Sequence, residues 1–304
     1  MNHLIVDGFG LAFRSHYAFS ELRTATGNLS GCVYGFLVSL SPWKKRFMDC
    51  HITVAWDSGH ARRDAAFSGY KADRPKLTMG DQIHDLKASL ACMNITQAES
   101  PGEEADDVIA ALVKQYSEEG RVFIFSSDKD ITQLVQNGKV IMIRPSSGKN
   151  QERFFDEEEV KREFEVTPKN MACYQAFRGD TVDSIPGLPR VRSTIIAALV
   201  EKYITPDDIY RHLAEEKLTD FERKAFTDFE QQAKVNFQLT QLVNDIPLQI
   251  TKGSIDPQKF SSYLNKYEIR KIASEPYTKL FENESSFNNR ASPVLEVASL
   301  FDEE

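Results

Sequence analysis

The sequence predicts an α/β fold built on a mostly parallel sheet, followed by a helical second region. Short apolar segments at residues 3–6, 52–56 and 122–125 have the length and composition of buried strands. Helical periodicity fills the intervals, at residues 33–47, 82–93 and 104–119. Because strands that alternate with helices usually join as parallel crossovers, we expect the three strands to share one parallel sheet.

The composition is that of an ordinary globular protein. Its 304 residues, 41% apolar and 27% charged, allow one large or two ordinary domains. No apolar run is long enough to span a membrane, and Asp7 interrupts the first one, which excludes a signal peptide. The four cysteines lack paired spacing and the six histidines form no zinc motif. We therefore expect a cytoplasmic protein without a zinc site or disulfides.

The first two predicted strands each end in an acid. Asp7 follows residues 3–6, where Gly8 permits a turn, and Asp57 follows residues 52–56. Ligands bind at the carboxyl ends of strands in open α/β sheets. The two carboxylates are therefore expected at one edge of the sheet.

A third group of acids begins the helix that precedes residues 122–125. Ser100 is predicted as its N-cap, with Pro101 at the first helical position and Glu103 completing a capping box. Glu104, Asp106 and Asp107 then fall in the first turn. The helix dipole favours acids there, so a capped and solvated turn is the alternative explanation.

The density of acids favours a metal site over that alternative. Asp128 and Asp130 follow the strand at residues 122–125 after two serines. Carboxylates brought together at one sheet edge repel one another unless a cation neutralises them, and oxygen ligands select hard divalent cations. The sequence thus predicts a divalent-metal site.

A basic segment lies between Asp57 and Glu104. It combines aromatic residues with cations, a composition that suits a phosphate backbone and unstacked bases. A solvated basic loop is the alternative. The predicted contact residues are Arg62, Arg63, Tyr70, Lys71, Arg74 and Lys76.

The net charge of −8 fits a nucleic-acid enzyme only if many acids bind metal ions. Residues 283–304 also carry five acids against one arginine. Once loaded with metal, the remainder of the chain could present a positive surface.

The second half reads as helical. After an apolar helix at residues 171–177 come Asp180 and Asp183, three residues apart and able to face one direction. Arg190 and Arg192 precede the apolar run at residues 194–200. Residues 220–245 are predicted helical, residues 246–250 a short strand, and the last 20 or so disordered.

Seven short motifs follow one another along the chain: VDG (6–8), VYGF (33–36), WDS (56–58), GYKADR (69–74), EADD (104–107), SDKD (127–130) and GDTVDSIPG (179–187). In this order they closely resemble the 5′-nuclease superfamily, which includes flap endonucleases and the 5′-nuclease domain of bacterial DNA polymerase I. Across residues 4–250 the resemblance is greatest to the phage ribonuclease H and exonuclease group.

The resemblance implies a PIN-like α/β nuclease domain at residues 1–155, with a helical arch at about 62–95. A helical DNA-binding domain with a modified helix-hairpin-helix would follow at 156–282, and a flexible acidic tail at 283–304. Arg14 also matches a basic position of the family and is expected to contact nucleic acid.

The family's acidic ligands fall on nine acids, all present in this chain, and imply two or more Mg²⁺ or Mn²⁺ ions. They are Asp7, Asp57, Glu104, Asp106, Asp107, Asp128, Asp130, Asp180 and Asp183. The ions would activate a water and neutralise the leaving oxygen of a phosphodiester. Tyr70, Lys71 and Arg74 are the implied catalytic side chains of the arch, with Lys71 and Arg74 stabilising phosphate charge. Implied substrates are 5′ flaps, nicked duplex ends and RNA·DNA hybrids.

The chain departs from the family after Gly187. Arg190 and Arg192 occupy the glycine positions of the hairpin, and bulky residues disfavour a positive φ. This puts in doubt the potassium site that most members carry. We expect the two arginines to hold duplex instead.

Other partners follow from the tail and from the family. Leu300 and Phe301 resemble a sliding-clamp peptide, although a solvated tail explains them equally well. A single-strand-binding protein is a further expected partner, and a monomer is expected. A PIN-type ribonuclease would not need Asp180, Asp183 or the helical half, and a non-catalytic relative would lack some of the nine acids.

Overall fold

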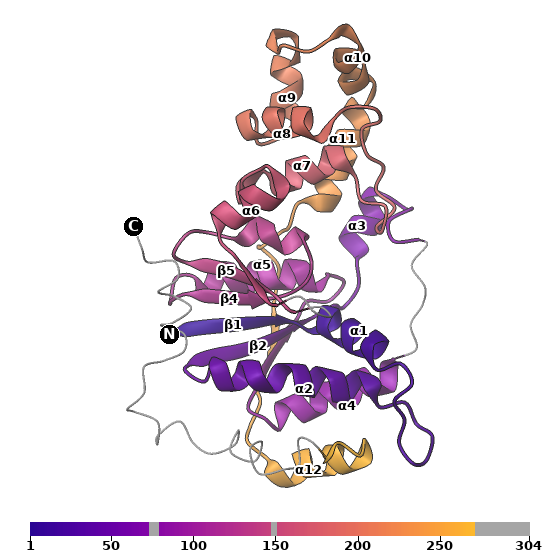
Figure 1. Cartoon of the computed structure of the whole chain (residues 1–304), viewed down its shortest axis with the longest axis vertical. Helices are drawn as coiled ribbons and strands as arrows, with labels where there is room; N and C mark the ends of the chain where they lie inside the picture. The colour runs from indigo at the N-terminus through magenta and orange to yellow at the C-terminus, as the bar shows by residue number, and fades with distance from the viewer. Residues whose placement is uncertain (73–78, 147–150, 271–304) are drawn as a thin grey trace.

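Seven strands form one mixed sheet in the part of the chain that the computed structural model describes, residues 1–72, 79–146 and 151–270. Their order across the sheet is β6-β5-β4-β1-β2-β3-β7. Figure 1 labels the central strands β5, β4, β1 and β2. The strands are β1 (Asn2–Asp7), β2 (Cys50–Trp56), β3 (Thr96–Glu99), β4 (Val122–Phe125), β5 (Val140–Arg144), β6 (Arg153–Phe155) and β7 (Gln249–Thr251).

The centre of the sheet is parallel, as predicted. Strand β1 pairs with β2 and β4, β2 pairs with β3, and β4 pairs with β5, whereas the edge strands β6 and β7 are antiparallel. In register, Asp7 lies opposite Ala55 and Val6 lies opposite Phe125. The carboxyl ends of β1, β2 and β4 therefore meet at one edge.

Helices cover both faces of this sheet and extend beyond it (Figure 1). Residue alternation along β1 divides the core, because Leu4 and Val6 pack in one apolar cluster and Ile5 in another. The helices are α1 (Gly8–Ala18), α2 (Gly31–Arg46), α3 (Ala61–Ala66), α4 (Gly80–Ala91), α5 (Ala105–Tyr116), α6 (Glu157–Phe164), α7 (Met171–Arg178), α8 (Ser193–Lys202), α9 (Pro206–His212), α10 (Asp220–Asp228), α11 (Glu230–Thr240) and α12 (Pro257–Lys266).

The helical region shares its core with one face of the sheet. Val108 of α5 belongs to the same apolar cluster as Phe177 of α7 and Phe226 of α10. Short 3₁₀ turns η1 (Asp130–Leu134), η2 (Pro168–Asn170) and η3 (Leu213–Glu215) connect elements within this part. Because the cluster is continuous, α7 is packed close to the acidic edge.

The chain returns to the sheet after α11, close to the short strand predicted at residues 246–250 and within the predicted helical domain of residues 156–282. Strand β7 pairs with β3, and Phe260 of α12 packs in the same cluster as Leu86 of α4. Residues 249–266 therefore belong to the sheet side of the molecule. The predicted tail, with Leu300 and Phe301, lies outside the described residues.

Helix α5 begins later than its sequence predicts. Its N-cap is Glu104, and residues 101–103 form a turn in which Gly102 has a φ of +79°. The Gly102 N–H donates to the Ser58 carbonyl at 3.1 Å and the Gly102 carbonyl accepts from Ala61 at 2.8 Å. The predicted capping box is wrong because these long-range hydrogen bonds fix the turn. None of the described helices is long and apolar enough to cross a bilayer.

Candidate functional site

Asp7 stands at the centre of the acidic edge, with 6% of its surface exposed. Its carboxylate caps α1 by accepting the Gly10 N–H at 2.7 Å and also accepts the Ser126 hydroxyl at 2.8 Å. A Cβ on Gly8 would lie 2.6 Å from the Ala55 carbonyl oxygen. Close strand packing, rather than a left-handed turn, therefore requires Gly8.

Hydrogen bonds of the backbone place the acids that follow β2 and β4. Asp57 accepts the Ala105 N–H at 3.2 Å, which joins the end of β2 to the start of α5. Beyond β4, Ser126 accepts the Asp128 N–H at 3.0 Å and Asp128 accepts the Asp130 N–H at 2.9 Å. Hydrogen bonds therefore fix the positions of the acids that follow β1, β2 and β4 relative to the start of α5.

Burial and mutual repulsion raise the pKa values of these carboxyls. Burial is the main cause, raising the pKa of Asp7 to about 7 and that of Asp130 to about 8. Burial, followed by the charges of Asp128, Asp7 and Asp130, raises the pKa of Asp106 well above its usual range. The pKa values of Asp57 and Asp128 are raised too, again mainly by burial. A bound cation would relieve this repulsion.

The acids do not form a finished coordination sphere. In residues 1–72, 79–146 and 151–270, no three His, Cys, Asp or Glu side chains are grouped as a metal site requires. The donor set nevertheless fits a hard cation, because it consists of carboxylate oxygens that repel one another.

Asp180 and Asp183 contact different partners. Lys129 lies 2.8 Å from Asp180 Oδ2, and although burial opposes it, this hydrogen bond and charge hold the pKa of Asp180 below its usual range. Asp183, 8% exposed, has its Oδ2 3.5 Å from the Tyr70 hydroxyl. Lys129, which follows β4, therefore links Asp180 to the acidic edge. Tyr70, which follows α3, links Asp183 to the same edge.

Tyr70 and Lys71 meet at Glu104. The Tyr70 hydroxyl donates to Glu104 Oε2 at 3.0 Å and the Lys71 ammonium contacts Oε1. Lys71, at a φ of +51°, also donates its backbone N–H to the Asp183 carbonyl at 3.3 Å. Both predicted catalytic residues thus adjoin predicted ligands. Arg74 and Lys76 lie outside the described residues.

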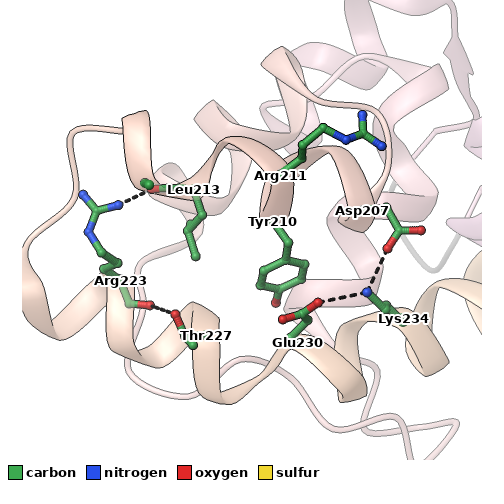
Figure 2. Close-up of a pocket in the computed structure, with 9 residues that line it drawn as sticks. Asp207, Tyr210, Arg211, Leu213, Arg223, Thr227, Glu230 and Lys234 are labelled. Atoms are coloured by element: carbon green, nitrogen blue, oxygen red, sulfur yellow. Dashed lines mark hydrogen bonds and ion pairs between the residues drawn. The ribbon is translucent and has the colours of Figure 1, made fainter.

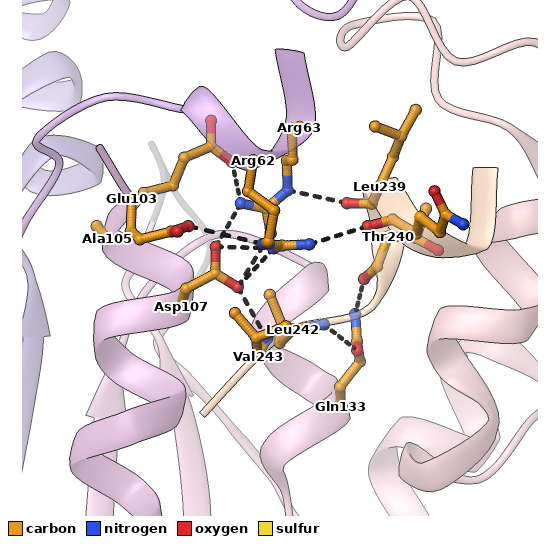
Figure 3. A network of polar contacts seen from close by, with 12 residues as sticks. Arg62, Arg63, Glu103, Ala105, Asp107, Gln133, Leu239, Thr240, Leu242 and Val243 are labelled. Atoms are coloured by element: carbon orange, nitrogen blue, oxygen red, sulfur yellow. Dashed lines mark hydrogen bonds and ion pairs between the residues drawn. The ribbon is translucent and has the colours of Figure 1, made fainter. Parts of the chain in front are cut away.

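Arg62 and Arg63 face inward from α3 toward Asp107 (Figure 3). Arg63 is 2% exposed and lies 2.7 Å from Glu104 Oε2 and 2.5 Å from Asp107 Oδ2. Arg62 lies 3.1 Å from Asp107 Oδ1. The prediction that Arg63 contacts nucleic acid is wrong, because its guanidinium is buried in ion pairs. Asp107, completely buried, faces these arginines and not the other acids.

The remaining predicted cations lie on surfaces. Arg14 of α1 lines a pocket of about 310 Å³ with Trp43 and Arg46. Arg190 and Arg192 are exposed between α7 and α8. Arg190 adopts the left-handed conformation, with a φ of +61°, although bulky residues disfavour it. Arg192 instead has a φ of −68°.

A larger pocket, of about 580 Å³, lies among α9, α10 and α11 and contains no predicted site residue (Figure 2). Its charged groups are satisfied internally, since Lys234 pairs with Asp207 at 3.0 Å and Glu230 at 2.9 Å. Arg223 donates to the Leu213 carbonyl. Because none of its lining residues belongs to the acidic edge, the pocket is a separate feature.

Three contacts of the acids were missed at the sequence level. Ser126 binds Asp7, Lys129 pairs with Asp180, and the Gln175 amide donates to Asp130. Lys129 lies within the motif that carries Asp128 and Asp130, and Ser126 directly precedes that motif, so their position in the sequence was the available signal. Gln175 comes from α7, 45 residues away from Asp130, so only the fold reveals it.

Comparison with known proteins identifies the class and then the family. Residues 2–165 match the family described as 5′-3′ exonuclease, N-terminal resolvase-like domain, and residues 166–262 match the 5′-3′ exonuclease, C-terminal SAM fold. The chain therefore belongs to the 5′-3′ exonuclease family, a family of nucleases, and the predicted resemblance is confirmed.

Relatives and solved structures agree. The 5′-3′ exonuclease of Aquifex aeolicus is 30% identical over 290 residues, covering 92% of this chain and 96% of that protein. DNA polymerase I of Mycobacterium leprae is 30% identical over 96% of this chain, which spans 33% of that enzyme. The T5 5′-exonuclease with bound zinc has the same fold, with a TM-score of 0.63 and 20% identity, over 90% of this chain and 100% of that one.

Proposed function

We propose that the chain is a structure-specific 5′ nuclease that cuts 5′ flaps and nicked duplex ends and removes RNA primers in DNA replication or repair. The observation that carries this proposal is the convergence of buried and half-buried, mutually repelling acids at the carboxyl edge of β1, β2 and β4. Membership of the 5′-3′ exonuclease family supports it. A T5 flap endonuclease has been solved as a pseudo-enzyme–product complex with DNA and metal ions, with a TM-score of 0.62.

Two or more Mg²⁺ or Mn²⁺ ions are the proposed cofactors. Carboxylate oxygens suit these hard cations. When bound, such ions would activate a water and neutralise charge on the phosphodiester. The proposed ligands are Asp7, Asp57, Glu104, Asp106, Asp128 and Asp130, with Asp180 and Asp183 toward a second ion.

The chain's own residues prepare this site. Tyr70 and Lys71 hold both oxygens of Glu104, and Ser126 orients Asp7 toward the same edge. Lys71, with Arg74, is proposed to stabilise charge on the phosphate. Because Lys71 contacts Glu104 in this structure, its ammonium is already beside the reacting region before substrate arrives.

Arg190 and Arg192 are proposed to hold the duplex backbone in place of a potassium site. Both are exposed on the hairpin that precedes α8, while Leu188 and Val191 anchor it in the core. Replacing both arginines by alanine should reduce the salt dependence of duplex binding by about two phosphate contacts. An unchanged salt slope would contradict this assignment.

Cleavage assays test the proposed function. A 5′-end-labelled flap duplex and an RNA·DNA hybrid are incubated with Mg²⁺ or EDTA, with Asp128→Asn as the control. Mg²⁺-dependent cutting near the junction, lost in the variant, is expected. Cutting of RNA alone would favour a PIN-type ribonuclease, and no cutting with any divalent metal would favour a non-catalytic binding protein.

Partner proteins are a separate proposal. Leu300 and Phe301 are proposed to bind a sliding clamp, because a short apolar pair in an acidic end has the character of such a peptide. A clamp pull-down that survives replacement of both residues by alanine would remove it.

A further inference from the structure

Asp107 has an environment unlike that of the proposed ligands. Both of its carboxylate oxygens are occupied by guanidinium groups, and it has no exposed surface (Figure 3). We propose that Asp107 is a positioning residue and not a metal ligand. Together with Arg62 and Arg63 it fastens α3 and the end of α11 to the first turn of α5, which carries Glu104 and Asp106. The inference rests on the proposed function in one respect, that Glu104 and Asp106 are ligands.

The hydrogen bonds of Asp107 leave no room for a cation. Oδ1 accepts Arg62 Nη2 at 3.1 Å, Arg63 Nη2 at 3.2 Å and the Val243 N–H at 2.9 Å. Oδ2 accepts Arg63 Nη1 at 2.5 Å and Arg62 Nη2 at 3.2 Å. A metal ion could bind here only by displacing two guanidinium groups from a buried carboxylate, which would remove the buried counter-charge that both arginines share.

The two arginines extend the contact to the helical region. Arg63 Nε donates to the Leu239 carbonyl at 2.9 Å, and Arg62 Nη1 donates to the Gln238 carbonyl at 3.1 Å. Since Asp107 also accepts the Val243 N–H, the end of α11 is held on both sides. Segments more than 100 residues apart in the chain are thus joined at one carboxylate.

Arg63 connects this contact to the acidic edge. Its Nη1 lies 2.7 Å from Glu104 Oε2 as well as 2.5 Å from Asp107 Oδ2. Glu104 in turn accepts a hydrogen bond from the Tyr70 hydroxyl and contacts the Lys71 ammonium. Loss of the Asp107 charge would therefore free Arg63 to move toward Glu104, and the position of a proposed ligand would change although no ligand had been removed.

A parallel link runs through η1. Gln133 donates to the Thr240 carbonyl at 2.8 Å and approaches Gln175 at 3.4 Å, and Gln175 donates to Asp130. The end of α11 is therefore connected to acids of α5 and of the β4 edge at once. The ion pair of Asp107 with the two arginines therefore sets the distance between the end of α11 and the first turn of α5.

The test compares Asp107→Asn with Asp106→Asn, and uses Asp64→Asn as a matched control, because Asp64 is an exposed residue of α3 whose carboxylate lies 2.8 Å from Nδ1 of His60, the N-cap residue of that helix. Mn²⁺ affinity is measured by electron paramagnetic resonance, and the cleavage rate in single turnover at saturating Mn²⁺ and DNA. We expect Asp107→Asn to keep its Mn²⁺ affinity within about threefold, while its saturated rate falls about 10- to 100-fold. Asp106→Asn should lose Mn²⁺ affinity by tenfold or more. The control should match the wild type.

A double variant shows whether Asp107 acts through Arg63. Asp107→Asn should lower Tm by several degrees because it leaves a guanidinium buried with less compensation. Arg63→Gln with Asp107→Asn should lose less Tm than the sum of the single variants. The proposal is overturned if Asp107→Asn weakens Mn²⁺ binding as much as Asp106→Asn does, or if its rate and Tm equal those of Asp64→Asn.

Failure of the proposed function would be recognised separately. A wild-type protein that binds Mn²⁺ but cuts no substrate would contradict the nuclease assignment alone. In that case the Mn²⁺ affinities and the Tm coupling between Asp107 and Arg63 would still decide the role of Asp107.

Discussion

Asp106 and Asp107 are neighbours in the first turn of α5 and have opposite surroundings. About 100° of helical rotation separates them. Asp106 is repelled by Asp7, Asp128 and Asp130, whereas Asp107 is enclosed by Arg62 and Arg63. The comparison teaches that residue type does not decide which acid is available to a metal ion. For these two neighbours the difference is that both oxygens of Asp107 already accept from guanidinium groups, whereas Asp106 is surrounded by other carboxylates.

The largest effect on cleavage is expected from replacing Asp106, the acid that lies among other carboxylates. Asp106→Asn removes a carboxylate that only a cation can compensate, so we expect Mg²⁺-dependent cleavage to fall more than a hundredfold, beyond the ~10–100-fold typical of groups behind the ligands. In EDTA at pH 8 its Tm should rise by a few degrees, because repulsion is relieved. Cleavage kinetics and thermal melts check both effects. A lower Tm in EDTA would contradict the repulsion argument.

Replacing Ser126 should have a smaller effect than replacing Asp106, because it changes the surroundings of the acids and leaves the acids in place. Ser126→Ala removes the hydroxyl that donates to Asp7 and accepts from Asp128. Metal affinity should fall about 10- to 100-fold, because support of a ligand is lost while every carboxylate remains. Titration of cleavage with Mg²⁺ measures the effect. Ser127→Ala, one residue further along, serves as the control and should resemble the wild type.

The pH dependence of the free energy of unfolding should show whether the acids at the sheet edge repel one another or are neutralised by the protein. The folded protein keeps protons on Asp7 up to about pH 7 and on Asp130 up to about pH 8, whereas the unfolded chain loses them near pH 4. Between these limits the unfolded state binds fewer protons, so the free energy of unfolding falls as pH rises.

Denaturation in EDTA from pH 5 to 8.5 measures this slope. Asp180, whose pKa is lowered, titrates below that window and does not oppose it. Addition of Mg²⁺ should flatten the slope, because bound cations replace the protons. Stability that rises with pH in EDTA would show that the acids are compensated by the protein.

The smallest expected effect concerns Arg190. Its φ of +61° costs a non-glycine residue about 1 kcal/mol, while glycine gains entropy in the unfolded chain. Arg190→Gly should therefore change the free energy of unfolding by less than about 1 kcal/mol. Duplex affinity should nonetheless fall at low salt. Urea denaturation and binding titrations separate the two quantities.

Much of the fold follows from local pattern. The apolar segments ending in Asp7, Asp57 and Asp128 predict parallel strands with acids at one edge, and they pair as expected. The start of α5 could not be predicted, because Gly102 is fixed in a turn by donating to the Ser58 carbonyl and accepting from the Ala61 N–H. Likewise, periodicity cannot tell that Asp107 faces arginines, since Arg62 and Arg63 reach it only after α3 packs on α5.

Proton release during metal binding tests the central claim most directly. Calorimetric titration with Mn²⁺ at pH 7, repeated in buffers of different ionisation enthalpy, counts the protons displaced. If the repelling acids are the ligands, the wild type should release about one to two protons, and Asp7→Asn should release fewer. Binding of Mn²⁺ without proton release, equal in both proteins, would place the metal elsewhere and contradict the account.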